Sequence, residues 1–323
     1  MQVEETLKRL RDEVGRIVVG QPGLIDGLLT GLLAGGHVLV EGVPGVAKTT
    51  AVRTLAQALG LGFRRIQFTP DLLPGDVVGT PVYVPHEGTF SVRRGPIFAP
   101  VVLADEINRA PAKVQSALLE AMEERQVTIG EETFPLPDPF LVMATQNPID
   151  LEGTYPLPEA QVDRFLLKLV VAYPEAEEEH EIVLRDARPS PRLRAITDAA
   201  RVSELREAAA AVHAAEAVTA YAVRLVRATR DPELGGAVLG QGAGRPAAGS
   251  LAVGASPRAS IFLVRAARAR SLLEGRRFAT PHDIKRVAPD VLRHRLILSY
   301  EAEADGITVD QVIEALLGQV ETP

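Results

Sequence analysis

The chain of 323 residues contains neither cysteine nor tryptophan, and aromatic residues make up only 4% of it. Without cysteine there can be no disulfide, no thiolate metal site and no cysteine nucleophile. The six histidines form no H-x-x-x-H pair, and no G-x-S-x-G sequence occurs. These absences argue against zinc, thiol and serine-hydrolase chemistry.

Long apolar runs are absent as well. Residues Met1 to Val14 alternate charge with leucine instead of forming an apolar signal core, and no segment is apolar over the length of a membrane span. The composition, 46% hydrophobic and 24% charged, is that of a globular protein. We therefore expect a cytoplasmic protein without membrane insertion, and the length predicts two packed units.

The stretch from residue 37 to residue 50 organises the chain. Its first part, HVLVE, is typical of a short buried strand, and GVPGVAKTT follows as a Gly/Pro turn that opens a helix. In such a loop, backbone N–H groups converge on an anion and the helix N-terminus adds its positive end. The pattern predicts a cradle for the phosphates of ATP or ADP, formed by Gly42, Val43, Pro44, Gly45, Val46, Ala47, Lys48, Thr49 and Thr50.

Two side chains of this loop have separate predicted roles. Lys48 reaches the outer phosphates, and the hydroxyl of Thr49 ligates Mg²⁺. Ala47 departs from the general pattern, which has glycine before the lysine, and we expect a negative φ there to accommodate the methyl group. The alternative is a strand-to-helix turn that binds nothing, which the order of strand, loop, lysine, hydroxyl and helix disfavours.

Short runs rich in Val, Ile and Leu recur through the first half of the chain. Such runs, with little polar alternation, are typical of strands buried on both faces of a parallel sheet. Helical patterns lie between several of them, and helices are expected at residues 2–16 and 24–33. We predict an α/β core, a parallel sheet flanked by helices, with strands at residues 37–41, 64–68, 101–105, 140–145 and 166–171. Two inserted β-hairpins are predicted at residues 80–95 and 125–135.

From about Pro174 the sequence becomes rich in Ala, Leu, Glu and Arg, with no strand signal. We therefore predict an αβα nucleotide-binding domain at residues 1–173 and a helical domain at residues 174–323. A Gly/Ala-rich loop, residues 235–254, contains a G-x-G-x-x-A string that follows no strand and is interpreted as loop. Helices are expected at residues 175–187, 201–214, 217–229, 258–273, 281–294 and 308–317.

Polar residues follow two of the predicted strands. Asp105 is suited to hold Mg²⁺ through water, and Glu106 to polarise a water for attack on the γ-phosphate. Asn147 can orient that water; a turn-forming Asn before proline is the alternative. Arg164 precedes the last strand and could reach a neighbouring subunit as an arginine finger, although spacing alone favours a salt bridge on its own surface.

A set of motifs in fixed order resembles the MoxR family of AAA+ ATPases over nearly the whole chain. Members of this family share the alanine before the lysine. The motifs are Val18-Val19-Gly20-Gln21, Gly42-Val43-Pro44-Gly45-Val46-Ala47-Lys48-Thr49, Ala104-Asp105-Glu106-Ile107-Asn108-Arg109-Ala110, Ala144-Thr145-Gln146-Asn147-Pro148, Asp163-Arg164-Phe165 and Ser256-Pro257-Arg258.

The resemblance implies a role for each matching residue. Lys48 and Thr49 correspond to Walker A, Asp105 and Glu106 to Walker B, and Asn147 to sensor 1. Arg164 corresponds to the arginine finger and Arg258 to the sensor 2 arginine of a helical lid. Gly20 and Gln21 lie where the family contacts adenine, and the two hairpins resemble inserts that line the opening of a ring.

The resemblance also implies an activity: a ring, expected to be a hexamer, that hydrolyses ATP and acts as a chaperone on client proteins, including metalloenzymes, often with a von Willebrand factor A domain partner. A nucleic-acid motor with the same core is the first alternative, and a P-loop phosphotransferase is another. The net charge of −7 argues against nucleic acid. The basic stretch from Arg258 to Arg295 has only Phe278 to stack bases, so we favour an interface or nucleotide-facing role for it.

Overall fold

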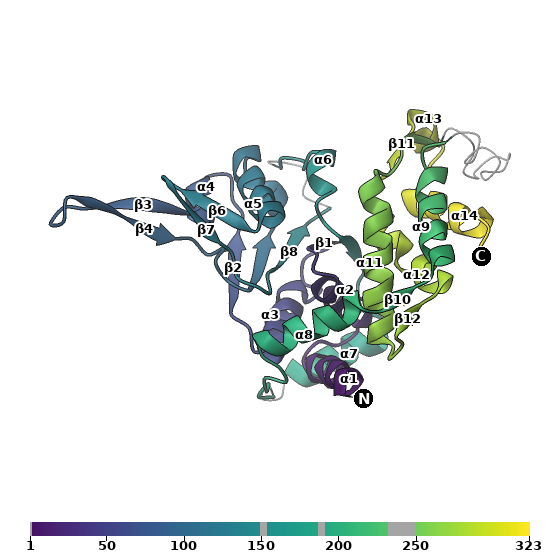
Figure 1. Ribbon diagram of the computed structural model, residues 1–323, viewed down its shortest axis with the longest axis horizontal. Coiled ribbons are helices and arrows are strands. Elements are labelled where there is room, and N and C mark those ends of the chain that lie inside the picture. The colour runs from purple at the N-terminus through teal and green to yellow at the C-terminus, as the bar shows by residue number, and fades with distance from the viewer. Residues whose placement is uncertain (1, 149–153, 187–190, 232–249) are drawn as a thin grey trace. The chain divides into compact units, whose positions relative to one another are not determined.

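The computed structural model describes residues 2–148, 154–186, 191–231 and 250–323 (Figure 1). The chain forms two compact units: Met1–Phe165 with Leu169–Arg206, and Leu166–Lys168 with Glu207–Pro323. The first unit thus continues past residue 174, through the helix Ala176–Asp186 and into the helix Ala199–Ala210, which the division crosses after Arg206. The domain limits at residues 173 and 174 remain a prediction.

A five-stranded sheet forms the centre of the first unit, with the strand order β2-β5-β8-β1-β9. Neighbouring strands β2 and β5, β5 and β8, and β8 and β1 are parallel. All five strands lie where apolar runs predicted them, within one residue at each end. Their bounds are Val38–Gly42 (β1), Phe63–Gln67 (β2), Val101–Asp105 (β5), Leu141–Gln146 (β8) and Leu167–Val171 (β9).

Burial along each strand follows its position in the sheet. Every residue of the interior strand β5 is buried, as we expected for strands covered on both faces. The edge strand β2 differs, because Arg64 and Arg65 are exposed while Ile66 is buried. A strand with a free edge needs fewer apolar residues, and this explains the polar sequence of β2.

Helices cover both faces of the sheet, with α5 on one side and α2 and α3 on the other (Figure 1). On α5, Val114 and Leu118 pack in one buried cluster with Val102 and Ala104 of β5. The helices of this unit are Gln2–Gly15 (α1), Pro22–Leu33 (α2), Lys48–Ala58 (α3), Pro74–Val78 (α4), the 3-10 helix Ile107–Arg109, Ala112–Glu124 (α5), Glu159–Val162 (α6), Ala176–Asp186 (α7) and the larger part of Ala199–Ala210 (α8).

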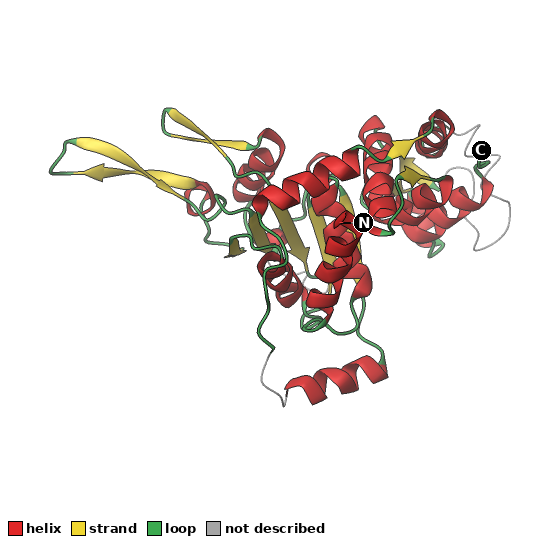
Figure 2. Ribbon diagram, turned by 60° about the horizontal axis from the view of Figure 1, so that its bottom comes forward, coloured by secondary structure: helices red, strands yellow, loops and turns green. Residues whose placement is uncertain are grey.

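Both predicted hairpins are present as separate two-stranded sheets. The first, Gly79–Val84 (β3) with Thr89–Arg94 (β4), extends away from the central sheet (Figure 2). The second pairs Gln126–Ile129 (β6) with Glu132–Pro135 (β7). The core with two inserted hairpins therefore has the predicted architecture.

The second unit is helical, as predicted, with helices Glu216–Ala228 (α9), Pro257–Leu273 (α11), Pro281–Leu292 (α12), Tyr300–Ala304 (α13) and Val309–Gln319 (α14). The expectation that no strand lies among them is wrong. The described residues of this unit contain four short strands: His213–Ala214 (β10), Leu251–Val253 (β11), Phe278–Ala279 (β12) and Ile297–Leu298 (β13). Segments of two or three residues are too short to show alternation.

Most of the predicted loop at residues 235–254, including its G-x-G-x-x-A string, lies outside the described residues. Within the described part, no helix combines the length and the apolar character that crossing a membrane requires.

Candidate nucleotide-binding site

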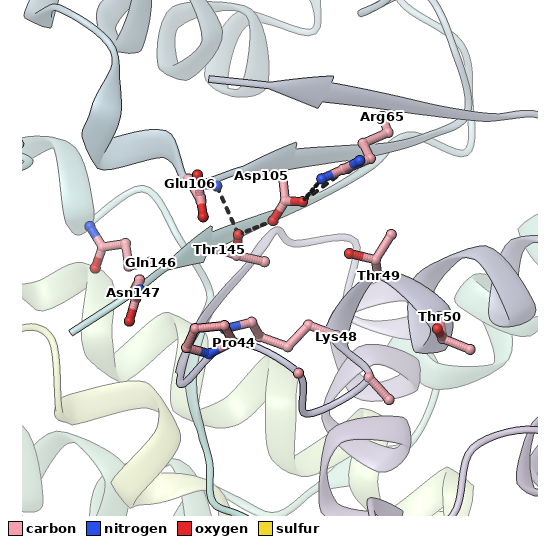
Figure 3. A pocket seen from close by; sticks show the side chains of 12 residues that line it. Pro44, Lys48, Thr49, Thr50, Arg65, Asp105, Glu106, Thr145, Gln146 and Asn147 are labelled. Atoms are coloured by element: carbon pink, nitrogen blue, oxygen red, sulfur yellow. Dashed lines mark hydrogen bonds and ion pairs between the residues drawn. The ribbon is translucent and has the colours of Figure 1, made fainter. Parts of the chain in front are cut away.

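A pocket of about 380 Å³ lies where the loop after β1 faces the carboxyl ends of β5 and β8 (Figure 3). Parallel strands bring these ends to one edge of the sheet, so residues far apart in sequence meet there. The lining residues are Pro44, Gly45, Ala47, Lys48, Thr49, Thr50, Arg65, Asp105, Glu106, Thr145, Gln146 and Asn147. The pocket unites most of the predicted loop with both acids and Asn147.

The loop between β1 and α3 uses left-handed backbone at two positions, Gly45 with φ of 88° and Ala47 with φ of 59°. The expected negative φ at Ala47 is therefore wrong. Ala47 precedes the first residue of α3, and its carbonyl accepts the N–H of Ala51. The turn into the helix needs this geometry, which alanine adopts at a cost of about 1 kcal/mol.

The side chain of Lys48 folds back over its own loop. Its Nζ donates to the carbonyl oxygens of Gly42 and Val43, at 3.1 Å for the second. Burial lowers the pKa of Lys48, and the charges of Asp105 and Glu106 partly oppose this shift. The ammonium thus lies between the loop carbonyls and the acids, where phosphate oxygens could be bound.

Asp105 is buried at the end of β5 and both of its carboxylate oxygens accept hydrogen bonds. The hydroxyl of Thr145 donates to Oδ1 at 2.6 Å. From the edge strand β2, the guanidinium of Arg65 donates to Oδ2 through Nε at 2.9 Å and Nη2 at 2.7 Å (Figure 3). The carboxylate is therefore held by one fixed neutral donor and one cation.

Glu106 adopts a left-handed conformation with φ of 56°. Its backbone N–H donates to Oγ1 of Thr145 at 2.9 Å, so one hydroxyl binds both acidic residues. Oε2 of Glu106 accepts from Nε2 of Gln67 at 2.9 Å and lies 3.2 Å from Nε of Arg109. Such non-glycine strain is typical of functional positions and here turns Glu106 out of the strand.

The oxygen donors of this pocket suit Mg²⁺. Thr49 supplies a hydroxyl and Asp105 a carboxylate, both hard ligands. Among the residues that the structure describes, no group of three or more His, Cys, Asp or Glu side chains could hold a metal by itself. Mg²⁺ usually keeps several waters and is bound by one or two carboxylates together with phosphates, so Thr49 and Asp105 are the protein ligands such an ion would need.

Seven predicted site residues lie outside the pocket lining: Gly42, Val43 and Val46 of the loop itself, and Gly20, Gln21, Arg164 and Arg258. Gly20 has φ of 69° and packs against Glu178, and Nε2 of Gln21 donates to the carbonyl of Ala172 at 3.3 Å. Arg164 forms an ion pair of 2.9 Å with Glu123 of α5, the surface pairing that spacing alone favoured. Arg258 lies in the first turn of α11 in the second unit. Their nucleotide-related roles remain predictions.

Three lining residues were assigned no role from the sequence: Arg65, Thr145 and Gln146. Thr145 carries a detectable signal, because it is a lone hydroxyl at the end of an apolar strand. Arg65 offers none that points to the site, since a charged residue on an edge strand is usually a solvated side chain.

The comparisons with known proteins agree with this geometry. Residues 37–167 match the model of the ATPase family associated with various cellular activities (AAA), and residues 247–316 match the AAA lid domain. The chain is 52% identical over 98% of its length to Chaperone MoxR1 of Mycobacterium tuberculosis, of which it covers 82%. It is 35% identical over 98% of its length to Protein MoxR of Methylorubrum extorquens, covering 94% of that protein. The crystal structure of a putative ATPase from Cytophaga hutchinsonii is 48% identical in sequence, with a TM-score of 0.90. The match covers 100% of this chain and 96% of the chain in that structure.

Proposed function

The chain belongs to the MoxR family of AAA+ ATPases, and from this we propose that it binds and hydrolyses Mg-ATP in the pocket of Figure 3 to remodel a partner protein. One observation carries the proposal: Lys48, Thr49, Asp105, Glu106 and Asn147 line a single cavity. The order of the lysine and hydroxyl at a helix start, facing two acids, is the arrangement that phosphoryl transfer to water needs.

Each of these side chains has a task in the proposed reaction. Lys48 binds the outer phosphates, and Glu106 accepts a proton from the attacking water while Asn147 orients it. Thr49 and Asp105 would hold Mg²⁺, which neutralises phosphate charge when bound. Thr145 keeps the two acids in register, since it donates to Asp105 and accepts from the backbone of Glu106.

The proposed site is shared between subunits of a ring, expected to be a hexamer. Arg164 would reach the γ-phosphate in a neighbouring subunit, and Arg258 would contact it from the helical lid. The family supports this arrangement, because an arginine supplied from a neighbour stabilises the charge of the transferring phosphoryl group. Hydrolysis would then depend on assembly.

The proposed role is that of a cytoplasmic chaperone acting on client proteins. The relative named Chaperone MoxR1 supports it, because its similarity extends over 98% of this chain and includes the helical unit. We further propose a von Willebrand factor A domain protein as partner and maturation of metalloenzymes as one task. These two steps rest on the family alone.

Replacing Glu106 by Gln tests the site. The amide keeps the shape of the carboxylate but cannot accept a proton, so we expect ATP binding to persist while turnover falls by about 10²-fold or more. Binding is measured with a fluorescent ATP analogue and turnover by phosphate release. Glu303→Gln, on the exposed surface of α13, is the matched control and should keep both ATP binding and turnover.

Unchanged turnover in Glu106→Gln would contradict the assignment of Glu106. Loss of binding in Lys48→Ala is expected alongside, because the ammonium is the cation of the phosphate cradle. Turnover that rises with added DNA and falls with salt would instead favour a nucleic-acid motor.

A further inference from the structure

Arg65 links the edge of the sheet to the acid that is suited to hold Mg²⁺. On β2, Arg65 and Gln67 lie two residues apart and therefore share one face of the sheet with Asp105, the residue of β5 that pairs with Gln67. Two nitrogens of the guanidinium donate to Oδ2 of Asp105, and Nη2 also donates to Oε1 of Gln67 at 2.5 Å. Figure 3 shows Arg65 reaching Asp105 across the gap between the strands.

The two donors to Asp105 differ in how easily they can leave. Thr145 is buried in an interior strand, so its bond to Oδ1 is fixed by the core. The side chain of Arg65 is 47% exposed on an edge strand and can turn into solvent. Oδ2 is thus the carboxylate oxygen whose hydrogen-bond donor can be replaced.

Mg²⁺ and the guanidinium of Arg65 cannot both be close to Oδ2 without cost. They carry charges of the same sign, and an ion held through Oδ2, directly or through water, needs a lone pair of the oxygen to which both Arg65 nitrogens donate. The guanidinium is half exposed to solvent, which screens its attraction to Asp105, so a divalent ion can displace it from Oδ2.

We propose that Arg65 is a positioning residue that competes with Mg²⁺ for Asp105, and so limits how strongly Mg²⁺ tightens nucleotide binding. The inference rests on the proposed function, because it assumes that the pocket binds Mg-ATP. It assigns to β2 a part in tuning Mg²⁺ affinity, from a strand outside the loop and acids of the site. The alternative role for a cation in this position is direct contact with a phosphate.

The test compares Arg65→Gln with Arg64→Gln. Arg64 is its exposed neighbour on the opposite face of β2, so the control removes the same charge from the same strand. The Kd of a fluorescent, non-hydrolysable ATP analogue is measured for the full chain in excess Mg²⁺ and in EDTA, with the melting temperature of each variant. Arg65→Lys serves as a second variant, which keeps the charge but loses the paired donors.

We expect Arg65→Gln to bind the analogue about three- to fivefold more tightly in Mg²⁺, with the Kd in EDTA unchanged or weaker. Arg64→Gln should have the Kd of the natural protein in both conditions. The Kd of Arg65→Lys in Mg²⁺ should lie between those of the natural protein and Arg65→Gln. An unchanged Kd in Mg²⁺, or a weaker one, would overturn the proposal, and equal weakening in both conditions would assign Arg65 to a phosphate. If Arg65→Gln failed to fold, Arg65→Lys would decide by the same criteria. No binding by the natural protein would instead refute the proposed function.

Discussion

At the scale of single residues, Ala47 has a backbone conformation that its side chain disfavours. Its φ of 59° is left-handed, and a β-carbon there costs about 1 kcal/mol or more relative to glycine. Ala47→Gly should therefore raise the free energy of unfolding, by up to about 1 kcal/mol once the greater freedom of glycine in the unfolded chain is subtracted. Urea unfolding followed by circular dichroism measures the change, since the chain has no tryptophan to report it.

The same substitution within a helix should have the opposite effect. Ala220 lies in the interior of α9, and Ala220→Gly should lower the free energy of unfolding by about 1 kcal/mol. If both variants were destabilised alike, the left-handed conformation at Ala47 would not be a source of strain.

Sequence reasoning at this scale found groups that bind but not the backbone that positions them. Lys48, Thr49 and Asp105 could be predicted, because a phosphate cradle and a metal need those side chains in that order. The positive φ of Ala47 could not, because the need for it arises from how the loop closes onto α3. Arg65 was missed for a related reason: its partner, Asp105, is 40 residues away and becomes a neighbour only through the pairing of β2 with β5.

At the scale of elements, the start of α12 is held by a buried acid. Asp283 accepts hydrogen bonds from the backbone and hydroxyl of Thr280, both at 2.7 Å, and from two nitrogens of Arg276. Burial alone would raise the pKa of Asp283, but these donors outweigh it and hold the pKa at about 2, below the ordinary 3.8. The depressed pKa means that the charged form stabilises the fold.

The sign of this shift fixes the pH dependence. The stabilisation, about 2 kcal/mol, is fully present above pH 4 and is lost as the pH falls toward 2. Asp283→Asn should therefore unfold more easily than the natural protein at pH 7, and the difference should shrink as the pH approaches 2. Asp305→Asn, at the exposed end of α13, is the control. It should change neither the free energy of unfolding at pH 7 nor its dependence on pH. A difference that stayed constant with pH would show that the charge of Asp283 is not what holds the helix.

Helices and strands could be predicted where burial of one or both faces imposes a regular pattern of apolar residues on the sequence. The interior strands β5 and β8 and the stripe on α5 are long enough for their apolar residues to define a strand or a helix. The four short strands of the helical unit have no such signal, because each contributes only two or three residues to a pair.

At the scale of the whole molecule, the role of Arg164 decides whether the catalytic site is shared between subunits or lies within one chain. Within its own unit this arginine pairs with Glu123, and both side chains are partly exposed, at 29% and 37%. Such a pair stabilises the fold by less than about 1 kcal/mol, so Arg164 can leave it at a subunit interface. If it then completes a neighbour's pocket, Arg164→Ala should lose turnover without losing nucleotide affinity.

Mixing two inactive variants tests the shared site directly. In a ring built from equal amounts of Arg164→Ala and Glu106→Gln, about a quarter of the interfaces join an intact Glu106 to an intact Arg164, so about a quarter of natural turnover should return. Mixing Glu106→Gln with Lys48→Ala is the control, because both changes lie in the same pocket and every pocket then carries a defect. Recovery only in the first mixture requires that Arg164 act on a neighbour. No recovery in either, with rings confirmed by light scattering, would leave Arg164 with the structural role that its ion pair with Glu123 already gives it.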